Sequence, residues 1–230
     1  MRGGNVAKGK RGGKGKITIG VEKNGTTING DKIEFDGDLT YTVNDPMPTV
    51  AQRAVLDAWE KARENAKVEY ANSVGYNGTE YGEIRGGKGS VRTPPYYSGN
   101  KGASFTHIHP RVESDLLGGT FSTGDLRVFS QGGCNTMRAV AKEGTYSISK
   151  GKNFNRQAFD KFMASSSRRH NTAMNKANRA LTAQYQANQI TYKQMSDGWS
   201  KNFNTMLVAV HQDLLDNQAQ YGYHYYLEKR

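Results

Sequence analysis

The sequence predicts an α/β (α+β) fold: a mostly antiparallel sheet with one packed helix, followed by a long C-terminal helical hairpin. Short runs of alternating apolar and polar residues, broken by Asn-Gly and Asp-Gly pairs, indicate antiparallel strands with tight turns. A capped apolar stripe that begins near residue 49 indicates the packed helix. Two long polar segments without proline, after residue 154, indicate the hairpin.

The first residues are expected to form a flexible basic arm. Residues 1–16 contain six Lys or Arg and no acidic residue, and they hold little that could pack in a core. The whole chain has a formal net charge of +11. We therefore expect this arm to contact nucleic acid or another acidic partner.

Strands and one helix follow the arm. Alternation predicts strands at 17–21, 33–35 and 39–43. Thr49 and Gln52 form a capping-box pattern, and the apolar stripe behind them predicts a helix over about 49–70. Beyond it, the sequence predicts short strands with loops over 72–102, a strand at 103–109, a short helix from Ser122, and a hairpin between residues 137 and 148.

The C-terminal part predicts two antiparallel helices. Segments 155–187 and 191–220 are long and polar with an apolar stripe each, and they turn near Asn188–Thr191. The alternating end, YGYHYYLEKR, predicts a closing strand. The domain organisation expected is a basic arm at 1–16, an α/β domain at 17–154, and a helical hairpin with its closing strand at 155–230.

Composition excludes several classes. The single cysteine, Cys134, permits neither a disulfide within the chain nor a zinc finger. No apolar run is long enough for a membrane span, and the basic N-terminus lacks the apolar segment of a secretory signal. We expect a cytoplasmic or virion-associated protein with no membrane partner.

Chemistry concentrates in SFTHIHPRVESDLLGGTFSTGDLRVFS, residues 104–130. His107 and His109 share one face of a strand, because side chains at i and i+2 point the same way. Pro110 ends that strand, so a later segment can fold back and offer Asp125 as a third zinc ligand. The alternative is an ordinary strand followed by a helix that Ser122 caps, with Asp125 in its first turn. Both interpretations can hold together, since a cap fixes the helix start and hence the direction of Asp125.

The sequence resembles the JAMM (MPN-type) zinc metallopeptidase-like domains of phage and bacterial accessory proteins. The resemblance is carried by the motif HIHP, followed by GGTFSTGDLRVFS, MRAVAKEGTYSI and a terminal YGYHYYLE. The resemblance covers roughly residues 74–150 and makes 17–154 a JAMM-like domain. It implies Zn²⁺ bound by His107, His109 and Asp125, and Ser122 as hydrogen-bond donor to the oxyanion. It also implies an upstream glutamate as general acid/base. Glu80, in EYGEIRG, is the preferred candidate, and Glu83 is its competitor.

Two features depart from the family. Residues 110–121 separate His109 from Ser122, a longer insertion than the usual motif has, which suggests a lid or substrate loop. Little chain separates Glu80 from His107, so the main helix is expected at 49–70.

Two functions remain open at this point. One is a zinc-dependent peptidase or isopeptidase whose protein substrate carries a ubiquitin-like tag or belongs to a virion. The other is a non-enzymatic phage virion or tail component, or a nucleic-acid-associated protein, with a vestigial metal site.

Overall fold

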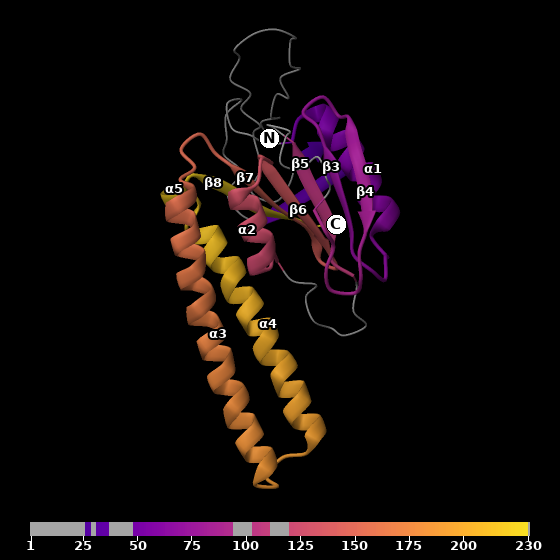
Figure 1. The fold of residues 1–230 in the computed structure, drawn as a ribbon. Coiled ribbons are helices and arrows are strands. Elements are labelled where there is room, and N and C mark those ends of the chain that lie inside the picture. The colour runs from indigo at the N-terminus through magenta and orange to yellow at the C-terminus, as the bar shows by residue number, and fades with distance from the viewer. Residues whose placement is uncertain (1–25, 29–30, 37–47, 94–102, 111–119, 230) are drawn as a thin grey trace, which may run out of the picture.

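The structure is a computed structural model, and it describes residues 26–28, 31–36, 48–93, 103–110 and 120–229. Eight strands form one sheet in the order β1-β2-β8-β7-β6-β5-β3-β4 (Figure 1). The elements in chain order are β1 (Thr26–Ile28), β2 (Asp31–Asp36), α1 (Val50–Arg63), β3 (Tyr70–Val74), β4 (Glu80–Arg85), β5 (Ser104–Ile108), α2 (Thr123–Gln131), β6 (Thr136–Ala141), β7 (Gly144–Lys150), α3 (Arg156–Gln186), α4 (Tyr192–Asp216), α5 (Gln218–Tyr221) and β8 (Tyr223–Lys229).

The sheet is mostly antiparallel, as the sequence predicts. Its one parallel pair among the described strands joins β5 to β6. A parallel pair cannot be connected by a tight turn, so the chain crosses over through α2. This crossover places the start of α2 beyond the carboxyl end of β5, where polar sites commonly form in α/β sheets.

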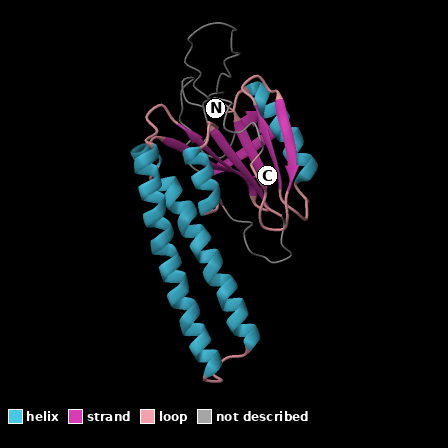
Figure 2. Ribbon diagram, in the orientation of Figure 1, coloured by secondary structure: helices cyan, strands magenta, loops and turns pink. Residues whose placement is uncertain are grey.

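Helices cover both faces of the sheet (Figure 2). On one face lie α2 and the ends of α3 and α4 nearest the sheet, over the main hydrophobic core. That core is built from side chains of strands and helices alike, including Phe105, Met137, Ile148, Phe129, Phe159, Leu214, Tyr223 and Tyr225. The other face carries α1, whose Trp59 packs with Ile108 and Val140. Successive residues of a strand therefore look toward different helices.

A buried ion cluster joins α1 to the sheet. The guanidinium of Arg138, on β6, is fully buried and donates to Glu60 on α1 at 2.7 Å and to Glu228 on β8 at 3.0 Å. Arg53 of α1 also pairs with Glu228. Opposite charges that bond to one another offset part of the cost of removing each from water.

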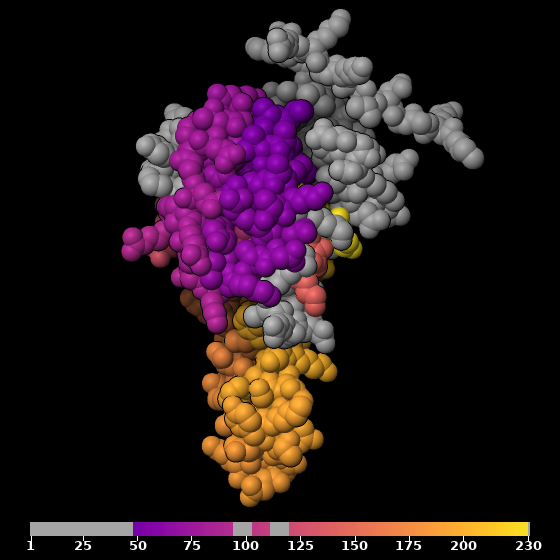
Figure 3. All heavy atoms as spheres, turned by 90° about the vertical axis from the view of Figure 1, so that its right-hand side faces the viewer, coloured from indigo at the N-terminus to yellow at the C-terminus, as the bar shows by residue number. Residues whose placement is uncertain are grey.

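The predicted hairpin is confirmed. Asn155 caps α3, Thr191 caps α4 with a capping box, and Asn188 takes a positive φ of 56° in the turn between them. The hairpin projects well beyond the sheet (Figures 1 and 3). The strand that follows the hairpin, β8, lies inside the sheet between β2 and β7. The hydrophobic core therefore extends across the boundary predicted between residues 154 and 155.

Most predicted elements are confirmed, and one boundary is wrong. The capping box of Thr49 and Gln52 is present, but α1 ends at Arg63 and not near Tyr70. Tyr70–Val74 instead forms β3, because pairing on both sides with β4 and β5 outweighs the local helical pattern. The predicted arm at 1–16, the strands at 17–21 and 39–43, and residues 111–119 of the insertion lie outside the described residues. No helix in the described ranges has the length and apolar character that crossing a membrane requires.

Candidate metal centre

His107 lies on β5 and His109 just after the end of that strand, and both side chains point to the same side of the sheet. The Nε2 atoms of His107 and His109 lie 2.9 Å apart. His107 is buried, with Phe105 stacked on its ring at 5.6 Å between centroids and Phe121 at 6.3 Å. His109 is half-buried. This packing restricts the ring of His107, whereas the ring of His109 faces the cavity that both histidines line.

Asp125 reaches both imidazoles from the first turn of α2. Its two carboxylate oxygens lie 3.5 Å from Nε2 of His107 and 3.8 Å from Nε2 of His109. The capping box holds the carboxylate in place: the backbone N–H of Ser122 donates to Asp125 Oδ2 at 2.7 Å. In return, the backbone N–H of Asp125 donates to the Ser122 hydroxyl oxygen at 3.2 Å. The same capping box therefore caps α2 and orients the candidate ligand Asp125, as the sequence allowed.

The three side chains fit a zinc ion. One ligand atom from each of His107, His109 and Asp125 lies within 4.8 Å of the others. The edge of a tetrahedron with ordinary zinc bonds is about 3.3 Å, close to the separations given above. Two imidazoles and one carboxylate are a ligand set that catalytic zinc uses, with a fourth position left for water. Burial raises the pKa of Asp125, but attraction from His107 and His109 outweighs it and holds that pKa well below the usual range. The carboxylate is therefore ionised, as a ligand must be.

A fourth ionisable side chain, Glu69, shares this cavity. The cavity has a volume of about 320 Å³ and is lined by Glu69, Ser90, His107, His109, Ser122 and Asp125 among others. Ala71 pairs with His107 at the end of the β3–β5 ladder, and Glu69 and His109 lie just beyond that end, where both line the cavity. Burial raises the pKa of Glu69, while His107 and His109 act to lower it and Asp125 to raise it.

The sequence did not single out Glu69. The helix predicted from residue 49 was expected to run to about Tyr70, so Glu69 was expected in its last turn. The stretch YANSV directly after it forms β3, but its residues do not alternate between apolar and polar and so gave no clear strand signal. The pairing of β3 with β5 brings this glutamate to the histidines.

Neither Glu80 nor Glu83 reaches the centre, contrary to the sequence prediction. Glu83 pairs with Asn72 and Glu80 with Val74, so a bulge in β4 inserts one extra residue between them. Gly82 takes a φ of +116° at this bulge, a conformation that favours glycine. Two glutamates three apart, expected on opposite faces, therefore share a face. It is the face of Asn72, which looks away from His107.

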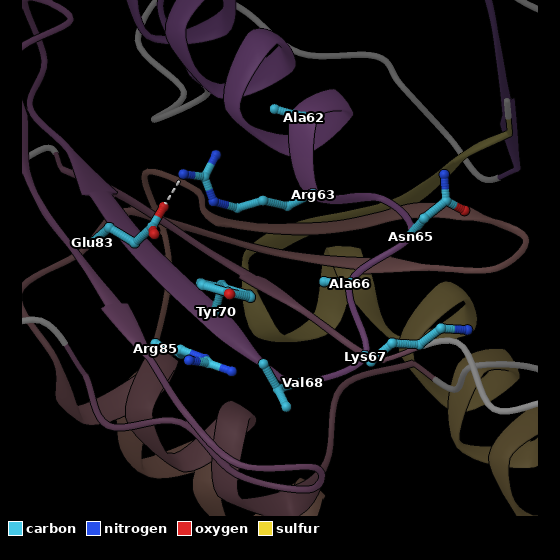
Figure 4. A pocket seen from close by; sticks show the side chains of 9 residues that line it. All are labelled: Ala62, Arg63, Asn65, Ala66, Lys67, Val68, Tyr70, Glu83 and Arg85. Atoms are coloured by element: carbon cyan, nitrogen blue, oxygen red, sulfur yellow. Dashed lines mark ion pairs between the residues drawn. The ribbon is translucent and has the colours of Figure 1, made fainter.

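The partners of the two glutamates agree with this placement. The amide of Asn72 donates to Glu80 at 3.0 Å, and the indole N–H of Trp59 donates to Glu83 at 2.7 Å. Glu83 also pairs with Arg63 in a wider hollow of about 640 Å³ on the α1 side, beside Tyr70 (Figure 4). Although this hollow is the larger of the two, the described residues that line it include no histidine. We therefore place the candidate chemistry in the smaller cavity.

Comparison with protein-family models, with curated proteins and with solved structures finds no match for this chain.

Proposed function

We propose that this protein is a zinc-dependent peptidase or isopeptidase of JAMM type, in which Glu69 is the general acid/base. The observation that carries the proposal is the convergence of His107, His109 and Asp125 with a carboxyl group in one cavity. The motif resemblance supports the reaction class, and the cavity supports the choice of glutamate. The proposed substrate is a protein, either one carrying a ubiquitin-like tag or a component of a virion, and the proposed location is the cytoplasm or a virion.

His107, His109 and Asp125 would hold the zinc ion. When bound, zinc would act as a Lewis acid toward the amide carbonyl and lower the pKa of a water molecule. Glu69 would take a proton from that water as its oxygen attacks the carbonyl carbon. It would then pass the proton to the amide nitrogen as the C–N bond breaks, which yields a carboxylic acid and a free amine.

Ser122 would stabilise the oxyanion formed during attack. Its hydroxyl oxygen accepts the hydrogen bond from the Asp125 backbone, so its own hydrogen can still be donated. Ser122 is exposed and lines the same cavity as Glu69. A donor aimed at charge that develops only during reaction lowers the barrier and does not merely tighten binding.

The metal site is tested by zinc content. We expect the wild-type protein, purified without added metal, to carry about one zinc per chain and His109→Ala to carry almost none. His170→Ala is the matched control. His170 also contacts an aspartate, Asp213, at 2.8 Å, but no second histidine joins them in the part of the chain that is described. Zinc retained in His109→Ala would place the metal elsewhere.

The acid/base role is tested separately. Glu69→Gln should keep its zinc, because the ligands are untouched, and lose turnover by roughly a hundredfold or more. Glu80→Gln is the control and should keep both, since its carboxylate lies on the other face. The probes are a ubiquitin dimer joined through a lysine isopeptide bond and its linear counterpart. If Glu69→Gln cleaves as fast as wild type while Glu80→Gln does not, the assignment is wrong.

A further inference from the structure

The outer face of α3 carries a line of cations that the proposed hydrolase does not use. Lys161, Arg168, Lys176 and Arg179 are all exposed. At about 100° per residue they fall within an arc of roughly 80°. The buried residues of the helix, Phe159, Met163 and Ser166, lie on the opposite side. We call these four cations, with Ser165 and Thr172 between them, the α3 basic face.

Charge on the hairpin is uneven. Helix α3 contains six Lys or Arg and one acid, Asp160, whereas α4 contains two Lys and three Asp. Two cations of α3 have acidic partners: Arg156 pairs with Asp160, and Arg169 with Asp213 of α4. The four cations of the α3 basic face pair with no acid of the described chain. A face that serves only solubility commonly mixes both signs, and this one does not.

The positions of these cations do not follow the helix dipole. The first turn of α3 has no acid and its last turn has no base, so the charges do not complement the helix dipole. Lys176 and Arg179 are like charges three residues apart, which is unfavourable on a helix. The positions of these cations are therefore not explained by the helix dipole or by pairing along the helix.

We propose that the α3 basic face binds the phosphate backbone of double-stranded nucleic acid without reading its sequence. Lys161 to Arg179 spans about 27 Å along the helix, which matches roughly eight base-pair steps of a duplex. Hydroxyl groups such as those of Ser165 and Thr172 also commonly donate to phosphates. The hairpin projects beyond the sheet, which leaves room for an extended ligand along α3 (Figure 1).

Other acidic partners fit this face less well. A protein partner would need apolar or aromatic anchors, and a membrane surface would need apolar side chains to insert. The arc between Lys161 and Arg179 holds neither. Bases of a single strand would need aromatic rings for stacking, and these are also missing from the arc. Phosphate contact alone requires only the cations and hydroxyl groups that are present.

The test uses the full chain and a fluorescent duplex of about 30 base pairs with arbitrary sequence, long enough for the whole face. One variant replaces Lys161, Arg168, Lys176 and Arg179 by Gln, a good helix former. The control replaces four other exposed lysines by Gln, which gives the same net charge: Lys142, Lys152, Lys193 and Lys201. Affinity is measured from low to high salt, and thermal melting checks the fold of both.

The α3 variant should bind roughly tenfold or more weakly and lower the slope of log K against log salt by about 3 to 4, near 0.9 per lost phosphate contact. The control should change the slope by less than about 1. Equal losses of affinity in both variants would mean that only net charge matters. No loss of affinity in the α3 variant would mean that the α3 basic face contacts only solvent. Equal binding to polyglutamate would also overturn the assignment to nucleic acid. Should the fourfold variant melt early, Arg168→Gln alone should still lower the slope by about 0.9.

Discussion

Replacing Glu228 by Gln tests how the buried ion cluster holds α1 on the sheet. The Glu228 carboxylate is buried and pairs with both Arg53 and Arg138. Burial acts to raise its pKa, but the two guanidinium groups outweigh burial and lower the pKa to about 2. Gln keeps the size of the side chain and removes its charge, so both arginines lose a charged partner in a place without water.

The size and pH dependence of the effect follow from that pKa. An ordinary glutamate titrates at about 4.5, so a folded pKa of about 2 contributes on the order of 3 kcal/mol at pH 7. A depressed pKa gives stability that is present above the unfolded value and is lost as pH falls toward the folded one. At pH 3 the same contribution is only about 1 kcal/mol. The difference between wild type and Glu228→Gln should therefore shrink by about 2 kcal/mol from pH 7 to pH 3.

Urea unfolding, followed by far-ultraviolet circular dichroism at both pH values, measures this difference. Asp197→Asn is the control, because Asp197 forms an exposed pair with Lys193 on α4. Exposed pairs contribute little, so the control should differ from wild type by less than about 1 kcal/mol at either pH. A Glu228→Gln difference that is the same at pH 7 and pH 3 would refute the reasoning, because the charge of Glu228 would then contribute nothing.

Three further predictions concern the site and the fold. Ser122→Ala should lower the free energy of unfolding by about 1 kcal/mol through the lost cap, and turnover by roughly a hundredfold, measured by urea unfolding and peptide cleavage. Gly144→Ala should lower the free energy of unfolding by about 3 kcal/mol, because a Cβ there, at φ +149°, would lie 2.0 Å from the Glu228 carbonyl oxygen. Gly89→Ala, with nothing within 4 Å of its Cβ, should change little in the same assay. Free zinc at about a hundred times its Kd should raise the stability of wild type by about 2.7 kcal/mol, or roughly 5–10 °C in melting temperature, and should not do so for Asp125→Ala.

The sequence predicted what depends on nearby residues. The caps Thr49 and Ser122 are local hydrogen-bond arrangements, and both are present. The pairing of His107 with His109 on one face follows from strand geometry alone. Asp125 was also predictable, because the capping box that orients it spans only four residues.

The glutamate could not be predicted in this way, because it depends on pairing between distant strands. Glu69 approaches His109 only through the register of β3 with β5, which no local pattern records. The bulge beside Gly82 turns Glu80 away through a one-residue change in register. A shift of one residue moves a side chain to the other face of a sheet, so a glutamate can match a motif in sequence and miss the site in space.

The position of the candidate centre has a cause in the topology. A parallel pair requires a crossover, and the crossover from β5 to β6 uses α2. The first turn of α2 therefore lies next to the end of β5, where His109 follows the strand. Free N–H groups at a helix start favour a carboxylate, and the same carboxylate faces the two imidazoles. Asp125 thus satisfies a requirement of the helix whether or not metal is present, and its carboxylate is oriented before zinc binds. The histidines and Glu69 take no part in this cap. Because His107 is also buried against Phe105 and Phe121, substitutions of His109 and Glu69 are the ones that should best separate function from folding.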